Sequence, residues 1–202
     1  MTTRRYDQEG KSMTKRRSGA ARRIGAVLGA AVTVGALLTV GAPAASADPM
    51  DGYSCEGGGY RILTPHTYGG ERMVLQVSQE RGEHGSIIQA PWDGEAVQQW
   101  QLCSRPDPDH PGSRFYKLKD HARWWCLAVD HGYEGDGAWL LTEGCSTATR
   151  QVFWSKPVPG TDLVALQAQH SSSWVAVQGG WWAAHAVQMQ FQADLFTLHK
   201  VW

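Results

Sequence analysis

The sequence predicts an all-β fold built from three similar four-stranded units. After residue 47 it contains no sustained 3.6-residue apolar stripe, its apolar residues alternate over short runs, and clusters of Gly, Asp, Ser and Pro separate those runs. Short strands with regular turns are typical of a sandwich or a barrel, and a repeat is needed to choose between them. The runs lie at 60–63, 73–77, 115–118, 125–129, 163–168 and 174–177.

The first 47 residues have the pattern of a secretory leader. Paired arginines precede an uncharged run over 24–40 that is rich in Ala, Val and Leu, and a small-residue stretch follows it. We therefore expect a signal peptide at 1–47, a single domain at 48–202 and a secreted, extracellular protein. A membrane anchor is less favoured, because the run falls short of about 20 strongly apolar residues. Arg22 and Arg23 leave open whether export follows the general or the twin-arginine route.

Removal of the leader leaves a negatively charged domain. Residues 1–47 contain eight of the 19 Lys and Arg and two of the 19 Asp and Glu, so 48–202 keeps 11 and 17, a net charge of −6. No basic cluster remains, so we expect no nucleic-acid partner, and no membrane partner after leader cleavage.

Three imperfect copies of one pattern fill this domain, at approximately 56–103, 114–156 and 162–202. Each copy has a central valine and closes with an aromatic residue. The valines are Val77, Val129 and Val177, and the closing aromatics are Trp100, Phe153 and Phe196. A single unit cannot bury its apolar face, so we expect the three to pack these residues into a core around a pseudo-threefold axis.

Four cysteines in an exported chain are expected to form disulfides, because the extracellular environment is oxidising. Three pairings are possible. Cys126 and Cys145 flank one strand-turn-strand unit and Cys55 and Cys103 bracket another, so we favour these two pairs. A zinc site is the alternative, but none of the spacings resembles a metal pair.

The second copy carries the motifs of a known family. It contains the sequence Cys-Leu-Ala-Val at 126–129, a later cysteine at 145 and Gln-Val-Phe at 151–153, and the first copy closes on Gln-Gln-Trp at 98–100. The chain thus resembles the β-trefoil lectins of the ricin B-chain type, whose repeats carry Cys-Leu-x-Val, a later Cys and a closing Gln-x-Trp. The resemblance implies a β-trefoil, with six strands forming a short barrel and six capping it as hairpins.

The resemblance also locates three sugar pockets, one beside each central valine. Strand alternation turns the residue before that valine outward, and sugar-binding members of the family have an aspartate there. We expect this slot to be open to solvent in each copy and to lack an acid, because its residues are Gln76, Ala128 and Ala176. The resemblance supplies further candidates: an assisting glutamine, absent from the second copy where Leu141 falls, and a platform aromatic. The candidate carbohydrate-binding residues are Gln76, Gln89, Trp92 and Gln188.

The tryptophans are expected to divide between core and surface. Trp125 shares a strand face with Leu127, which assigns it to the core, and Trp124 then points outward. Exposed indoles are what sugar C–H faces and protein hot spots dock against. The candidates for partial exposure are Trp92, Trp124, Trp139, Trp181 and Trp182.

Three functions compete at this stage. A non-catalytic carbohydrate-binding module, with a glycan or polysaccharide as partner, is favoured by the resemblance and by the surplus of tryptophan. A protein-binding trefoil, such as an inhibitor or a targeting subunit, is the alternative, favoured by the net negative charge and the turn at 181–182. An enzyme has no positive support: we find no nucleophile elbow, Cys–His arrangement or His-Glu-x-x-His motif, and we expect no catalytic residue, metal or cofactor.

Overall fold

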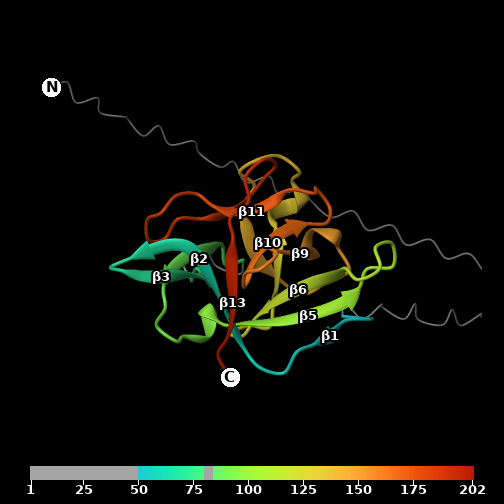
Figure 1. Cartoon of the computed structure of the whole chain (residues 1–202), viewed down its shortest axis with the longest axis horizontal. Coiled ribbons are helices and arrows are strands. Elements are labelled where there is room, and N and C mark those ends of the chain that lie inside the picture. Colours follow the sequence, from blue (N-terminus) through green and yellow to red (C-terminus); the bar gives the residue numbers. More distant parts are fainter. Residues whose placement is uncertain (1–49, 80–83) are drawn as a thin grey trace, which may run out of the picture. The chain divides into compact units, whose positions relative to one another are not determined.

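The computed structural model describes residues 50–79 and 84–202, and the predicted leader at 1–47 lies outside them. These residues form an all-β structure in which each repeat contributes four strands (Figure 1). The first repeat contains β2 (Tyr60–Tyr68), β3 (Glu71–Val77), β4 (Ile87–Pro91) and β5 (Trp100–Pro106). The second contains β6 (Arg114–Asp120), β7 (Cys126–Val129), β8 (Leu140–Glu143) and β9 (Phe153–Pro157). The third contains β10 (Leu163–Ala168), β11 (Trp174–Val177), β12 (Ala186–Met189) and β13 (Phe196–Lys200).

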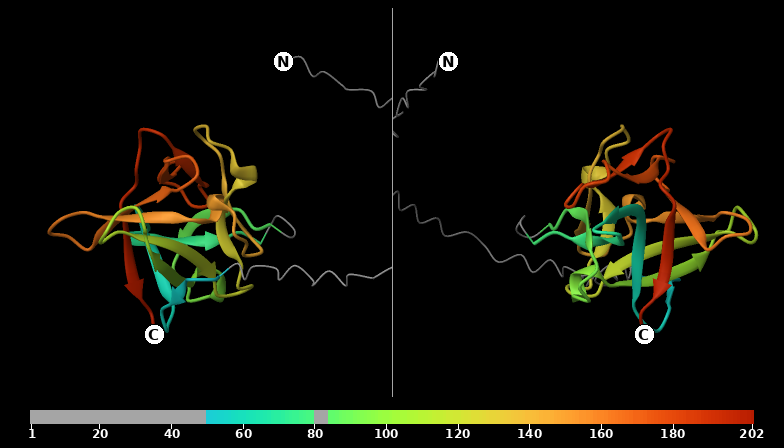
Figure 2. Two further views of the ribbon diagram at one scale, coloured as in Figure 1. Left: turned by 90° about the vertical axis from the view of Figure 1, so that its right-hand side faces the viewer. Right: turned by 60° about the vertical axis from the view of Figure 1, so that its left-hand side comes forward.

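The first and last strands of the repeats close into a six-stranded barrel. Antiparallel pairing runs from β2 to β5, β6, β9, β10 and β13, and β13 pairs with β2 again. The inner strands form three hairpins, β3–β4, β7–β8 and β11–β12 (Figure 2). The hairpins join one another through single bridges between Ser86 and Leu141, Ile88 and His185, and Trp139 and Val187. This is the β-trefoil with pseudo-threefold symmetry that the repeats predict.

The core lies where the three repeats meet. The central valines end β3, β7 and β11, the closing aromatics begin β5, β9 and β13, and all six side chains are buried. Trp100 also donates its indole N–H to the carbonyl of Leu75, at 3.1 Å. Trp100 therefore fastens the end of the first repeat to the hairpin of that repeat, and Phe153 and Phe196 share the same core cluster.

The glutamine of each Gln-x-aromatic motif holds the loop before the closing strand. Two short 3-10 helices, η1 (Ala96–Gln98) and η3 (Thr149–Gln151), carry these residues. Gln98 donates to Pro91 O at 2.7 Å and accepts from Asp93 N–H at 2.9 Å. Gln151 makes the equivalent bonds with Gly144 O and Ser146 N–H. The motif is therefore a structural device at equivalent places in two repeats.

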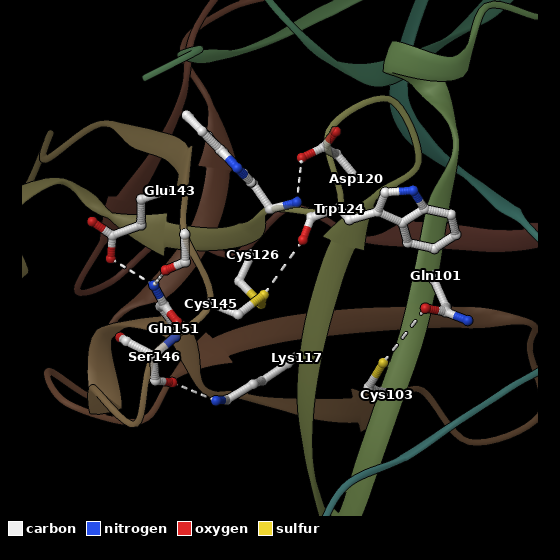
Figure 3. Close-up of a disulfide and its surroundings, with 12 residues drawn as sticks. Gln101, Cys103, Lys117, Asp120, Trp124, Cys126, Glu143, Cys145, Ser146 and Gln151 are labelled. Atoms are coloured by element: carbon white, nitrogen blue, oxygen red, sulfur yellow. Dashed lines mark hydrogen bonds between the residues drawn. A yellow bond between two sulfur atoms is a disulfide. The ribbon is translucent and has the colours of Figure 1, made fainter. Parts of the chain in front are cut away.

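Two disulfides have the expected pairing, Cys55–Cys103 and Cys126–Cys145. The first joins β1 (Ser54–Cys55), a strand outside the three repeats, to β5. The second joins the start of β7 to the loop after β8 and lies beside Gln151 and Glu143 (Figure 3). Each bridge restricts the unfolded chain and is expected to contribute about 3 to 4 kcal/mol to stability.

Candidate functional site: a groove between the first and third repeats

The three slots beside the central valines differ in accessibility, contrary to the expectation that all three are open. Ala128 and Ala176 are 0% and 1% exposed, whereas Gln76 is partly exposed. Outward-pointing strand residues become buried when the loop before the closing strand lies against them, which happens over β7 and β11. Sequence alternation correctly predicts the direction of each side chain but not what covers it.

An ion pair closes the slot of the second repeat. Glu143 lies on the same face of the β7–β8 hairpin as Ala128, because Cys126 pairs with Glu143 and Ala128 with Leu141. Arg150 contacts this carboxylate with both ends of its guanidinium, Nε to Oε1 at 2.8 Å and Nη2 to Oε2 at 3.0 Å. Burial would raise the pKa of Glu143, but the hydrogen bonds from Arg150 and Gln151 outweigh it and hold that pKa below its usual value. A sugar would have to displace this pair.

The slot of the third repeat is closed by Asp194. Its backbone N–H donates to Val175 O at 3.1 Å, and its carboxylate accepts from the N–H of Val177 at 2.7 Å. These bonds fasten the segment before β13 to β11 on both sides of Ala176. The Asp194 carboxylate is therefore engaged by the backbone N–H of Val177.

The first slot opens into a groove with an aromatic wall. Two adjoining cavities of about 590 and 310 Å³ share Gln76 and Trp182. The larger is also lined by Ser78, Gln79, Ser86, Ile88, Glu95, Ala183 and His185, and the smaller by Tyr68, Ala90, Pro91 and Asp93. The groove thus lies between the β3–β4 hairpin of the first repeat and the β11–β12 turn of the third.

Gln98 orients the polar side chain at the centre of the groove. Its Nε2 donates to Gln76 Oε1 at 2.8 Å, while its own Oε1 holds the backbone of Asp93 on the rim. Because Gln76 Oε1 accepts this bond from Gln98, the amide N–H groups of Gln76 are the ones left to face the groove. Of the four residues predicted to bind carbohydrate, Gln76 is the one that the structure places in the groove, where it offers hydrogen-bond donors rather than the acceptor that an aspartate would offer.

Gln89 has a structural role, which corrects its assignment to a sugar pocket. It pairs with Leu75 across the hairpin, so both side chains point to the core, and Gln89 is fully buried. Its Nε2 donates to Gly179 O at 2.9 Å and to Trp181 O at 2.8 Å, and its Oε1 accepts from Thr64. Gln89 therefore holds the neighbouring turn that carries Trp182 into the groove.

Gln188 is corrected for the same reason. It pairs with Val175, is fully buried, and donates to the carbonyls of Tyr133 and Gly135 in the second repeat. Its oxygen accepts from Ser171 Oγ at 2.8 Å. The register places Thr142, which pairs with Leu127, rather than Leu141 at the corresponding position of the second repeat. These residues join neighbouring repeats.

Trp92 is not part of the groove wall. The neighbouring Pro91 lines the groove, and Trp92 lies half-buried with the guanidinium of Arg61 at 5.4 Å from its ring centroid. The aromatic residues that do line the groove are Tyr68 and Trp182, both largely exposed. The sequence predicts exposure of Trp182 but does not place it or Tyr68 in a pocket, because Tyr68 ends β2 and Trp182 comes from the third repeat.

The electrostatic character of the groove is acidic. Asp93 and Glu95 are its charged rim residues, and Glu95 N–H donates to Asp93 Oδ1 at 2.9 Å, which fixes their spacing. No Lys or Arg lines the described part of either cavity. The arrangement can accept hydrogen bonds from hydroxyl or amino groups, donate from Gln76, and stack an apolar ring face on Trp182.

The other tryptophans follow the predicted division between core and surface only in part. Trp124, Trp181 and Trp182 are exposed, while Trp139 is half-buried and stacks on His185 with ring centroids 4.3 Å apart. Trp125, expected in the core, is only half-buried and lies against the guanidinium of Arg123. It precedes β7 and is outside the strand, so strand alternation does not govern its direction.

Residues 50–79 and 84–202 contain no cluster of three or more His, Cys, Asp or Glu side chains arranged to hold a metal ion. Within the same two ranges no helix has the length and apolar character needed to cross a membrane.

Comparison with known proteins identifies the fold through solved structures. ThreeFoil, a designed threefold-symmetric protein, is similar with a TM-score of 0.60 and 22% identity, covering 75% of this chain and 100% of that protein. A Polyporus squamosus lectin, solved with a human-type influenza-binding epitope, has a TM-score of 0.57 and 13% identity, covering 71% of this chain and 49% of that one. An exo-β-1,3-galactanase from Clostridium thermocellum has a TM-score of 0.58 and 18% identity, covering 72% and 31%. No protein-family model and no curated protein matches the chain.

These likenesses show the β-trefoil fold. The chain spans about half of the lectin and about a third of the galactanase.

Proposed function

We propose that the protein is a secreted, non-catalytic carbohydrate-binding β-trefoil that binds glycans in the groove between its first and third repeats. The observation that carries this proposal is the convergence of an oriented amide on Gln76, an exposed indole on Trp182 and two rim carboxylates on Asp93 and Glu95. Aromatic faces dock the C–H surfaces of sugars, and amide and carboxylate groups bond their hydroxyls. The solved neighbours include a lectin with a bound epitope and a galactanase, which is consistent with this use of the fold.

The charge of the groove selects the glycan class. Among the described residues no Lys or Arg lines the groove, so the carboxylates of Asp93 and Glu95 are expected to repel sugars that carry their own carboxylate and to favour neutral sugars or those with an amino group. A single shallow groove of this kind supports affinities near ~1 mM, about −4 kcal/mol. Useful retention on a polysaccharide would then come from many repeated ligand units along the polymer.

The experiment exploits two adjacent tryptophans. Trp181 and Trp182 follow one another in the same turn and are 63% and 59% exposed, but only Trp182 lines the groove. Retention of the protein on cellulose, galactan, chitin and chitosan should fall about tenfold for Trp182→Ala, and it should be unchanged for Trp181→Ala. Equal losses in both variants, or no retention of the wild type on any of the four polymers, would contradict a glycan site in the groove.

Secretion is tested separately from binding. Expression of the full chain in an exporting host should release a protein that begins near residue 48, as measured by intact mass of the protein in the medium. Retention of residues 1–47 on the recovered protein would contradict the proposed leader.

A protein-binding role is the second candidate, and exposed aromatic residues outside the groove favour it. Trp181 and Phe191 are 63% and 94% exposed, and neither lines a cavity described above. Exposed aromatics of this kind are frequent anchors of protein interfaces. Capture of one defined protein from culture medium by the wild type and Trp182→Ala, but not by Trp181→Ala, would support this role. The same pair of variants therefore separates the two functions.

A further inference from the structure

A second aromatic surface lies at the end of the chain. It consists of His121, Trp124 and Trp202, with Lys119 beside them, and we name it the C-terminal platform. The ring centroids of His121 lie 4.7 Å from Trp124 and 5.3 Å from Trp202. Both indoles remain about half exposed, at 48% and 57%. No residue of the platform lines either of the two cavities that form the groove.

The indole of Trp202 is held in place. Its Nε1 donates to Gln99 Oε1 at 2.9 Å, and the neighbouring Val201 N–H donates to Gly59 O at 2.8 Å. A Cβ on Gly59 would stand 2.9 Å from Trp202 Nε1, so glycine is what allows the ring to lie this close to the backbone. An aromatic surface that is already ordered loses little conformational entropy when a ligand binds.

Trp124 occupies a backbone conformation that does not suit it. Its φ is +60°, in the left-handed region that bulky side chains rarely adopt. Ser172 occupies the equivalent turn of the third repeat with a φ of +55°. The two turns close alike, since Trp124 N–H donates to Asp120 O and Ser172 N–H to Ala168 O. A small polar residue can therefore occupy this turn. A tryptophan at the same position adds backbone strain, and because its indole stays half exposed, little apolar surface is buried to offset that strain.

The charge beside the platform is positive. Lys119 Nζ lies 5.2 Å from the ring centroid of Trp124, and among the described residues it forms no ion pair. The adjacent carboxylate of Asp120 is fully buried and accepts from the backbone N–H groups of Arg123 and Trp125. An ammonium group beside two ordered indoles complements a ring that carries a carboxylate.

We propose that the C-terminal platform is a second glycan-binding site, for chains that contain uronic acids. The sugar C–H faces pack on the exposed parts of Trp124 and Trp202, and the uronate carboxylate pairs with Lys119. This site has the opposite charge preference to the acidic groove. It stands whether or not the groove binds a glycan.

Oligogalacturonate is the probe, and calorimetry with the complete secreted protein is the measurement. The wild type should bind with a Kd near ~1 mM in low salt and several-fold more weakly in about 0.5 M NaCl, because salt screens the pair with Lys119. Trp124→Ser and Lys119→Gln should each weaken binding by about tenfold. Trp182→Ala is the matched control and should bind oligogalacturonate as the wild type does.

Trp124→Ser also separates binding from folding. Because serine already occupies this turn in the third repeat, the variant should unfold at the same temperature as the wild type or higher. Unchanged oligogalacturonate affinity in this variant would overturn the proposal. So would the absence of wild-type binding at about 10 mM ligand, including the case in which a protein ligand alone binds the platform.

Discussion

The first and second repeats share one backbone framework, but the slot beside the central valine is open in the first repeat and closed in the second. In both, the Gln of the Gln-x-aromatic motif makes the same two backbone bonds, but its third bond differs. Gln98 bonds Gln76, whose amide N–H groups are directed to a groove. Gln151 instead bonds Glu143, which pairs with Arg150 on the hairpin face that carries Ala128. A pocket on this fold therefore depends on one or two side chains beside an unchanged framework.

The two motif glutamines provide the largest expected effect. Gln98→Ala and Gln151→Ala each remove a buried amide and leave backbone groups without partners, so each should lower the free energy of unfolding by about 2–3 kcal/mol. Urea denaturation measures this loss. Glycan retention should fall only for Gln98→Ala, because it alone releases Gln76. A loss of retention in Gln151→Ala that exceeds its loss of folded protein would break the comparison.

Filling the closed slot is the next test. Ala128→Gln copies Gln76 into the second repeat, where the side chain meets a position with no exposed surface. Overpacking there should lower the free energy of unfolding by about 2 kcal/mol and create no new glycan site. A stable variant with additional polysaccharide binding would show that the Glu143–Arg150 pair does not seal the slot.

Arg150→Ala removes the ion pair with Glu143, and the pH dependence of stability reveals what that pair contributes. The pKa of Glu143 is lowered in the folded protein, so this carboxylate contributes stability that is fully present above its unfolded pKa and is lost as pH falls through the lower folded pKa. The variant should be less stable by about 1 kcal/mol at neutral pH, since the pair is partly exposed. The difference between wild type and variant should shrink in acid. Thermal unfolding from pH 7 to pH 3 measures it, and a constant difference would contradict this role.

The smallest effect on stability is expected for Gln76→Ala. Gln98 keeps its bonds to Pro91 and Asp93, so the free energy of unfolding should change by less than about 1 kcal/mol. The groove loses its oriented donor, and glycan retention should fall about tenfold. Normal retention would assign binding to the aromatic wall alone.

The candidate site was only partly predictable because its pieces come from different repeats. Alternation along β3 identifies Gln76, and the resemblance draws attention to Gln89 and Trp92. The hairpin register turns Gln89 into the core, where it holds the turn of another repeat. Trp182 reaches the groove only through that turn, and a local sequence pattern contains no information about which hairpins become neighbours.

The sequence by itself determined the three repeats, their strands, the central valines and closing aromatics of the core, and the pairing of the cysteines, but not the position of Trp125. These features depend on strand alternation, on the repeated motifs and on where the cysteines lie relative to the repeats. Only the tertiary structure decided that one slot is open and two are closed, that Gln89 and Gln188 join neighbouring repeats, and that Trp182 faces Gln76. The physical reason is that accessibility depends on the loops that fold across each strand from elsewhere in the chain, and their contacts form only when the barrel closes.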